Sequence, residues 1–79
     1  MEDSIEAEVM AAVVRSQDLD PGKVTPESTF EELGMTSLDA LALINDLEEQ
    51  FNVAIPNEEA MALRTVGEAV ASVRRLVSP

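Results

Sequence analysis

The sequence predicts an all-α protein, a four-helix bundle with three long helices, a short third helix and a long loop between the first two helices. Three observations support this fold class. Apolar residues recur at helical spacing in three segments, capping patterns accompany those segments, and no segment alternates as a strand would. The chain has 79 residues, which is enough for one domain and too few for two. We therefore expect a single domain over residues 1–79.

The first helix is predicted near the amino terminus, through about residue 16. Four apolar residues share its core-facing stripe: Ile5, Val9, Ala12 and Val13. Asp3 followed by Glu6 forms a capping-box pattern at its start.

A long loop is predicted over residues 17–35. Asp20-Pro21-Gly22 is typical of a turn, and Pro26 interrupts any continuous helix. Because structureless loops of this length are uncommon in compact domains, we expect apolar side chains to hold the segment against the bundle. These are Val24, Phe30 and Leu33. Thr29 followed by Glu32 is a capping pattern for a single helical turn.

The second long helix is predicted over residues 37–51, with Thr36 or Ser37 at its start. Its core-facing residues fall at i, i+3, i+4, i+7 and i+11: Ala40, Leu43, Ile44, Leu47 and Phe51.

A short helix and a last long helix complete the bundle. Ile55-Pro56 stops regular structure, and Asn57 is the expected N-cap of a short helix that ends by about Leu63. Thr65 with Glu68 forms another capping box. The apolar stripe that follows contains Val66, Ala69, Val70, Val73 and Val77.

The composition argues against an enzyme. There is no Cys and no His, so thiolate nucleophiles, disulfides and the commonest general base and metal ligand are missing. Nothing pairs a nucleophile with an activating base. A calcium loop that starts at Asp18 fails on spacing, because Lys23 stands where Gly is required and Thr29 where Glu is required. We expect no catalytic residue and no metal site.

The charge predicts the kind of partner. Sixteen acidic and five basic residues give a net charge of −11, which disfavours nucleic acid and anionic membranes and favours basic protein surfaces. Between Lys23 and Arg64 there are nine acidic residues and no basic one. No segment approaches the roughly 20 apolar residues of a membrane span, and Met1-Glu2-Asp3 lacks the basic start of a signal peptide. We expect a soluble, cytoplasmic monomer.

Ser37 stands at the predicted start of the helix over residues 37–51, where backbone N–H groups without partners favour an anion. By itself, a serine there is an ordinary helix cap. The segment Phe30-Glu31-Glu32-Leu33-Gly34-Met35-Thr36-Ser37-Leu38-Asp39, however, resembles the attachment region of acyl carrier proteins. Three later segments are similar to that family at the same spacing: residues 47–51, 55–60 and 65–67.

The resemblance covers roughly residues 28–73 and implies an acyl-carrier-like fold in which Ser37 carries a covalent 4′-phosphopantetheine arm. It implies a non-catalytic carrier that holds acyl intermediates as thioesters on that arm. The implied partners are a phosphopantetheinyl transferase and a ketosynthase, an acyltransferase or other synthase enzymes with basic docking surfaces.

The expected docking residues lie on the second and third helices: Leu38, Asp39, Asp46, Glu48, Glu49, Glu58 and Glu59. Leu38 falls on the side of its helix opposite the core stripe, so it is expected to be an exposed apolar anchor. The resemblance also implies that the acyl chain folds back against core residues. These are Leu47, Phe51, Ile55, Ala60, Leu63 and Ala69.

The sequence departs from the family pattern in two ways. Thr36 stands where the family usually has Asp, which leaves open which transferase recognises the chain. Four positions that are commonly acidic in fatty-acid carriers are neutral: Ala42, Asn52, Ala54 and Asn57. We therefore expect a discrete carrier of polyketide biosynthesis rather than of housekeeping fatty acid biosynthesis. A carrier-like interaction subunit that is not modified, and an aminoacyl or peptidyl carrier of a nonribosomal peptide pathway, remain as alternatives.

Overall fold

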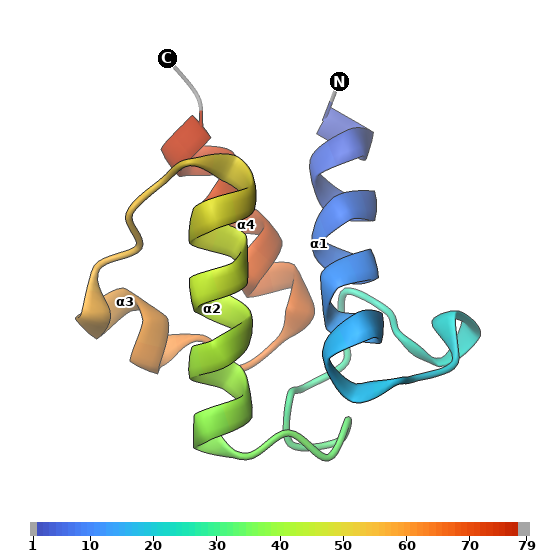
Figure 1. Cartoon of the computed structure of the whole chain (residues 1–79). Helices are drawn as coiled ribbons and strands as arrows, with labels where there is room; N and C mark the ends of the chain where they lie inside the picture. Colours follow the sequence, from blue (N-terminus) through green and yellow to red (C-terminus); the bar gives the residue numbers. More distant parts are fainter. Residues whose placement is uncertain (1, 78–79) are drawn as a thin grey trace.

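Three long helices pack together, and a short helix lies beside one of them (Figure 1). The computed structural model describes residues 2–77, without the side chains of residues 2 and 3. The elements in order are α1 (Glu2–Gln17), a 3₁₀ turn η1 (Pro21–Lys23), α2 (Ser37–Phe51), α3 (Asn57–Ala62) and α4 (Val66–Val77). The predicted all-α, four-helix fold is confirmed, and α2 begins and ends at the predicted residues.

The core lies between the three long helices. α1 runs antiparallel to α2 and α4, so the start of α2 lies at the same end of the bundle as the long loop and the start of α4 (Figure 1). The largest fully buried side chains come from all three: Val9, Val13, Leu43, Leu47, Val66 and Val73. No residue of α3 is fully buried, and Ala60 is the α3 residue that packs, half-buried, against the core.

Hydrogen bonds hold the long loop against the segment that joins α3 to α4. The N–H of Phe30 donates to the carbonyl of Arg64 at 2.9 Å, and the N–H of Val66 donates to the carbonyl of Ser28 at 3.0 Å. The three apolar residues expected to hold the loop all contact the core: Val24, Phe30 and Leu33. Met35 is buried beside them, so the loop is packed across the end of the bundle.

Two capping boxes form as the sequence predicts. The N–H of Thr29 donates to Glu32 Oε1 at 2.9 Å, and the N–H of Glu32 donates to Thr29 Oγ1 at 3.0 Å. The backbone bond from Thr29 lowers the pKa of the Glu32 carboxyl below its ordinary value. Thr65 and Glu68 make the same reciprocal pair at the start of α4.

The start of α3 differs from the prediction, because Asn57 is not its N-cap. Pro56 occupies that position with φ −55° and ψ 142°, and no side chain caps the helix. Proline fixes φ near this value and has no N–H to satisfy, so the helix can begin at the next residue. Asn57 is therefore the first helical residue, and its side chain is exposed. The helix ends at Ala62, one residue before the predicted end.

At the other end of the chain, α1 begins at Glu2. The predicted capping box of Asp3 with Glu6 depends on the side chain of Asp3, which lies outside the described residues. None of the helices within residues 2–77 is long and apolar enough to span a bilayer.

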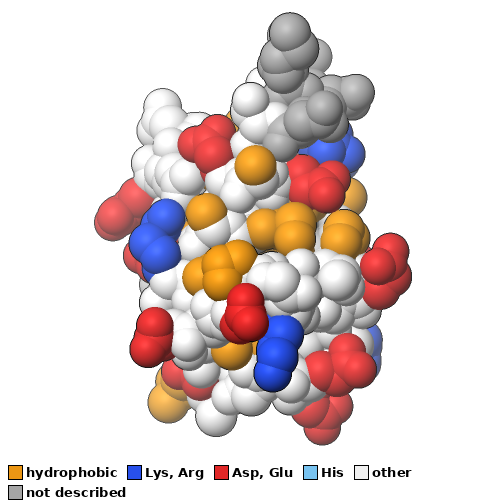
Figure 2. All heavy atoms as spheres, turned by 90° about the vertical axis from the view of Figure 1, so that its right-hand side faces the viewer, with side chains coloured by type: hydrophobic (Ala, Val, Ile, Leu, Met, Phe, Trp, Pro, Cys, Tyr) orange, Lys and Arg blue, Asp and Glu red, His pale blue; other side chains and the backbone are white. Residues whose placement is uncertain are grey.

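α1 and the long loop form the face shown in Figure 2. Hydrophobic side chains gather across the middle of this face, and charged side chains of both signs surround them (Figure 2). An apolar groove between α1 and the loop is lined by Ala7, Met10, Ala11, Val14, Pro21 and Val24, with Arg15 beside them. This face lies on the side of the molecule away from α3 (Figure 1).

Candidate functional site

Ser37 is the first residue of α2, and Thr36 is its N-cap. Thr36 Oγ1 accepts the N–H of Asp39 at 3.2 Å, and the N–H of Thr36 donates to Asp39 Oδ2 at 3.0 Å. Because Thr36 makes the cap, the Ser37 hydroxyl is not required for it. That hydroxyl belongs to an exposed residue and has no hydrogen bond to any described residue. It is therefore free for chemistry.

The backbone on both sides of Ser37 favours an anion at this position. Gly34 turns the chain with a φ of +79°, a conformation that glycine adopts without strain, and the loop then enters the helix. The first N–H groups of α2 and the positive end of its dipole stabilise a nearby negative charge by about 0.3–1 kcal/mol at an exposed site. The cap also acts on Asp39, whose pKa is lowered because the N–H of Thr36 donates to its carboxylate.

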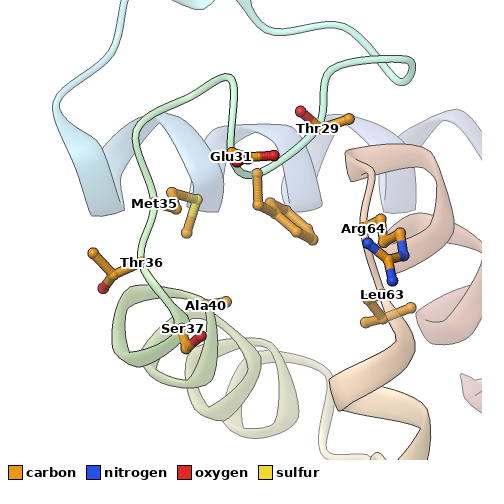
Figure 3. A pocket seen from close by; sticks show the side chains of 9 residues that line it. Thr29, Glu31, Met35, Thr36, Ser37, Ala40, Leu63 and Arg64 are labelled. Carbon is orange, nitrogen blue, oxygen red and sulfur yellow. The ribbon is translucent and has the colours of Figure 1, made fainter.

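A first cleft beside Ser37, here called the loop cleft, lies between the long loop, the start of α2 and the segment after α3 (Figure 3). Its cavity volume is about 290 Å³. Its polar lining residues are Thr29, Glu31, Thr36, Ser37 and Arg64. Its apolar lining residues are Phe30, Met35, Ala40 and Leu63. Arg64 and Ser37 line opposite sides of the cleft (Figure 3).

A second cleft that includes Ser37, here called the α2–α3 groove, has a cavity volume of about 300 Å³. From α2 it is lined by Ser37, Ala40, Leu41 and Ile44. From α3 and its flanks it is lined by Asn57, Ala60, Met61 and Leu63. Both clefts therefore open beside the same hydroxyl.

Two of the six residues expected to contact an acyl chain line this groove, namely Ala60 and Leu63. Three others are buried among the long helices: Leu47, Ile55 and Ala69. Phe51 is half-buried against the core, outside the groove. Helical spacing identifies the inward face of α2, but it does not say which part of that face remains open.

Two residues of the groove had been given no role from the sequence, namely Leu41 and Met61. Leu41 is 42% exposed and Met61 is 76% exposed, and each lines the groove from a different helix. The available signal was the position of Leu41, four residues after Ser37, which places the two side chains on the same face of a helix. Met61 had no comparable signal, because its position depends on how α3 lies beside α2.

Four of the seven expected docking residues are exposed on α2 and α3: Leu38, Asp46, Glu49 and Glu58. Leu38 is 77% exposed, the largest value among the exposed large hydrophobic residues of the described chain. These side chains are available to a partner on the outer surface of the two helices.

The other three carboxylates contact groups of this chain. Asp39 closes the cap of α2, and Glu48 accepts the N–H of Ile55 at 2.7 Å, which holds the connection between α2 and α3. Glu59 on α3 pairs with Arg75 on α4. The hydrogen bond from Arg75 lowers the pKa of Glu59, and a bond from Ser72 acts in the same direction. Among residues 2–77 there is no group of three or more His, Cys, Asp or Glu that could hold a metal ion.

Comparisons with known proteins agree with this geometry. The family described as "Phosphopantetheine attachment site" matches residues 7–73. An acyl carrier protein of Thermosynechococcus vestitus is 44% identical over 71 residues, which cover 89% of this chain and 88% of that protein. An acyl carrier protein of Wolinella succinogenes is 44% identical over 64 residues, which cover 80% of this chain and 84% of that protein.

Two solved structures share the fold. A proposed acyl carrier protein from Mycobacterium tuberculosis superposes with a TM-score of 0.84 at 30% identity, covering 90% of this chain and 96% of that chain. An acyl carrier protein from Thermotoga maritima gives a TM-score of 0.82 at 26% identity, covering 96% of this chain and 89% of that chain. With a family match over most of its length and relatives of this similarity, the chain belongs to the acyl carrier protein family, non-catalytic carriers built on a phosphopantetheine attachment domain.

Proposed function

We propose that Ser37 carries the phosphopantetheine arm and that the chain holds acyl intermediates on it as thioesters for biosynthetic enzymes. One observation carries this proposal: the exposed hydroxyl of Ser37 lies at the first residue of α2, while Thr36 supplies the cap. The N–H groups of the first turn favour the phosphate that would be esterified there. The arm supplies the thiol, so the chain needs no base or nucleophile of its own.

Loading with coenzyme A and a broad-specificity phosphopantetheinyl transferase, followed by intact mass measurement, tests the attachment. The wild-type chain is expected to gain one phosphopantetheine group, and Ser37→Ala none. Ser16→Ala is the matched control, because it removes an exposed serine from α1. No gain on the wild type would favour the alternative of an unmodified carrier-like interaction subunit.

For partner enzymes, we propose docking on the outer faces of α2 and α3. Leu38 is the apolar anchor there, and Asp46, Glu49 and Glu58 are exposed carboxylates that attract basic surfaces. Binding of the loaded chain to a ketosynthase is expected to weaken with salt and in Leu38→Ala. Glu8→Gln, on the exposed face of α1, is expected to leave ketosynthase binding unchanged. Equal weakening in Leu38→Ala and Glu8→Gln would contradict docking on α2 and α3.

For the acyl group, we propose the α2–α3 groove. Its volume of about 300 Å³ is at the low end of the 300–1,000 Å³ that is typical of small-molecule pockets. A short acyl group fits this space, whereas a longer chain requires α3 to move away from α2. The methyl resonance of Met61 is expected to shift when a short acyl group is attached. An unchanged resonance with both short and long groups would place the cargo outside the groove.

We also propose that the pathway is a specialised polyketide pathway. The support is that the four neutral positions noted in the sequence are all exposed: Ala42, Asn52, Ala54 and Asn57. Introducing Asp or Glu at these four positions is expected to raise the rate at which a ketosynthase of fatty acid synthesis uses the loaded chain as its substrate. Turnover by a polyketide ketosynthase is expected to stay the same or fall. The opposite pattern would contradict the assignment.

A further inference from the structure

Arg64 is the cation of the loop cleft, and the fold fixes its backbone on both sides. Its carbonyl accepts the N–H of Phe30 at 2.9 Å, and its own N–H donates to Glu68 Oε1 at 2.7 Å. Its side chain is exposed and lines the cleft opposite Ser37 (Figure 3). The guanidinium is therefore carried to this position by a well-defined backbone, while the side chain itself is free to bind.

Arg64 also makes no ion pair with a described residue, although the chain has sixteen acidic and five basic residues. Arg75, by comparison, pairs with Glu59. No other basic residue occurs between Lys23 and Arg74 in the sequence. A guanidinium with no carboxylate partner, in the same cleft as an exposed hydroxyl, has the charge and the hydrogen-bond donors that a phosphate ester requires.

We propose that Arg64 binds the phosphodiester of the arm on Ser37 and so holds the phosphate end of the arm at the loop cleft, from which the distal thioester can still reach the neighbouring α2–α3 groove. This inference rests on the proposed attachment at Ser37. A phosphodiester carries one negative charge and two free oxygens, which guanidinium N–H groups can contact together. The other lining residues fit the part of the arm next to the phosphate. Ala40 and Leu63 offer apolar contacts to its dimethyl carbon, and Thr29 offers a hydroxyl to its amides.

Glu31 lines the same cleft and opposes this interaction. Its carboxylate repels a phosphate, and Arg64 offsets that repulsion. Removing the two charges one at a time must therefore change the environment of the phosphate in opposite directions. Both side chains are exposed, so salt must weaken both effects.

The test uses the full chain loaded by a transferase, with loading verified by mass. The ³¹P shift of the phosphodiester is measured at low salt and at about 0.5 M NaCl for Arg64→Gln, Arg64→Lys, Glu31→Gln and the wild type. Arg15→Gln, on α1 and away from the loop cleft, is the matched control for net charge.

Wild type and Arg15→Gln are expected to show the same salt-dependent shift. Arg64→Gln is expected to show at low salt the shift that the wild type reaches only at high salt, with Arg64→Lys between them. Glu31→Gln is expected to shift in the opposite direction. Loading is also expected to raise the melting temperature of the wild type by a few degrees more than that of Arg64→Gln.

Identical ³¹P shifts in wild type and Arg64→Gln at both salts would overturn the role of Arg64, while the mass gain left the attachment intact. A wild-type chain without mass gain would refute the attachment and this inference together. If Arg64→Gln does not fold, the Nε–H resonance of Arg64 in the wild type decides. Its displacement on loading supports the contact, and an unchanged resonance overturns it.

Discussion

Thr36 and Ser37 are adjacent hydroxyl residues with different roles in the structure, and replacing each by Ala separates those roles. Thr36→Ala removes the oxygen that accepts the N–H of Asp39 at 3.2 Å. Loss of such a cap destabilises a protein by about 0.5–2 kcal/mol. The site is exposed and water can replace the lost acceptor, so we expect about 1 kcal/mol. For a chain of this size, that corresponds to a fall of about 4–8 °C in melting temperature.

Ser37→Ala is the matched control, since its hydroxyl has no hydrogen bond to a described residue. We expect a change within about 0.5 kcal/mol, as for other exposed substitutions. Thermal and urea unfolding of the two variants measure the difference. A loss in Ser37→Ala as large as that in Thr36→Ala would show that Ser37 supports the cap, and would refute the assignment of a free hydroxyl. Thr36→Asp retains an acceptor and is expected to keep the stability while it changes the rate of loading.

Three further outcomes follow from contacts elsewhere. Gly67→Ala would place a Cβ 2.9 Å from the carbonyl oxygen of Pro26. We expect the resulting strain, about 1–3 kcal/mol, to exceed the stabilisation that Ala gives a helix over Gly, so the melting temperature should fall. Arg75→Gln breaks the ion pair between α4 and Glu59 of α3. Because no residue of α3 is fully buried, we expect amide hydrogen exchange in α3 to become faster while exchange in α2 stays unchanged. The pKa of the Asp39 carboxyl is lower in the folded chain than in the unfolded chain. The carboxylate therefore stabilises the fold at pH values above the pKa of the unfolded chain, and this stabilisation is lost as the pH falls through the pKa of the folded chain. The difference in urea midpoint between wild type and Asp39→Asn should therefore shrink toward zero between neutral pH and about pH 2, and a constant difference would contradict this.

α2 could be predicted from the sequence with both ends correct, because local signals agree there. The apolar stripe continues to Phe51, and the cap at Thr36 coincides with its start. The start of α3 could not be placed as well, because Asn57 is a favoured N-cap residue by type, whereas the backbone puts Pro56, which has no capping side chain, at that position. The fold class and the capping boxes of the long helices depend on residues a few positions apart, which a sequence displays directly.

Features that join distant segments were outside the reach of such reasoning. The hydrogen bond between Phe30 and Arg64 fixes the long loop, and it also brings Arg64 into the cleft beside Ser37. Spacing along α2 predicted an inward face correctly, yet Leu47 is fully buried between helices while Met61 lines the open groove. Which residues of an inward face stay accessible depends on the neighbouring helix, and that neighbour is set by tertiary packing.

The most direct test that Ser37 carries the arm is a fragment mass spectrum of the chain after loading with coenzyme A and a phosphopantetheinyl transferase. We expect one added group per chain, carried by fragments that contain Ser37 and absent from fragments that end at Thr36. An added group on Thr36 or on another serine, or no added group on a folded wild-type chain, would contradict attachment at Ser37.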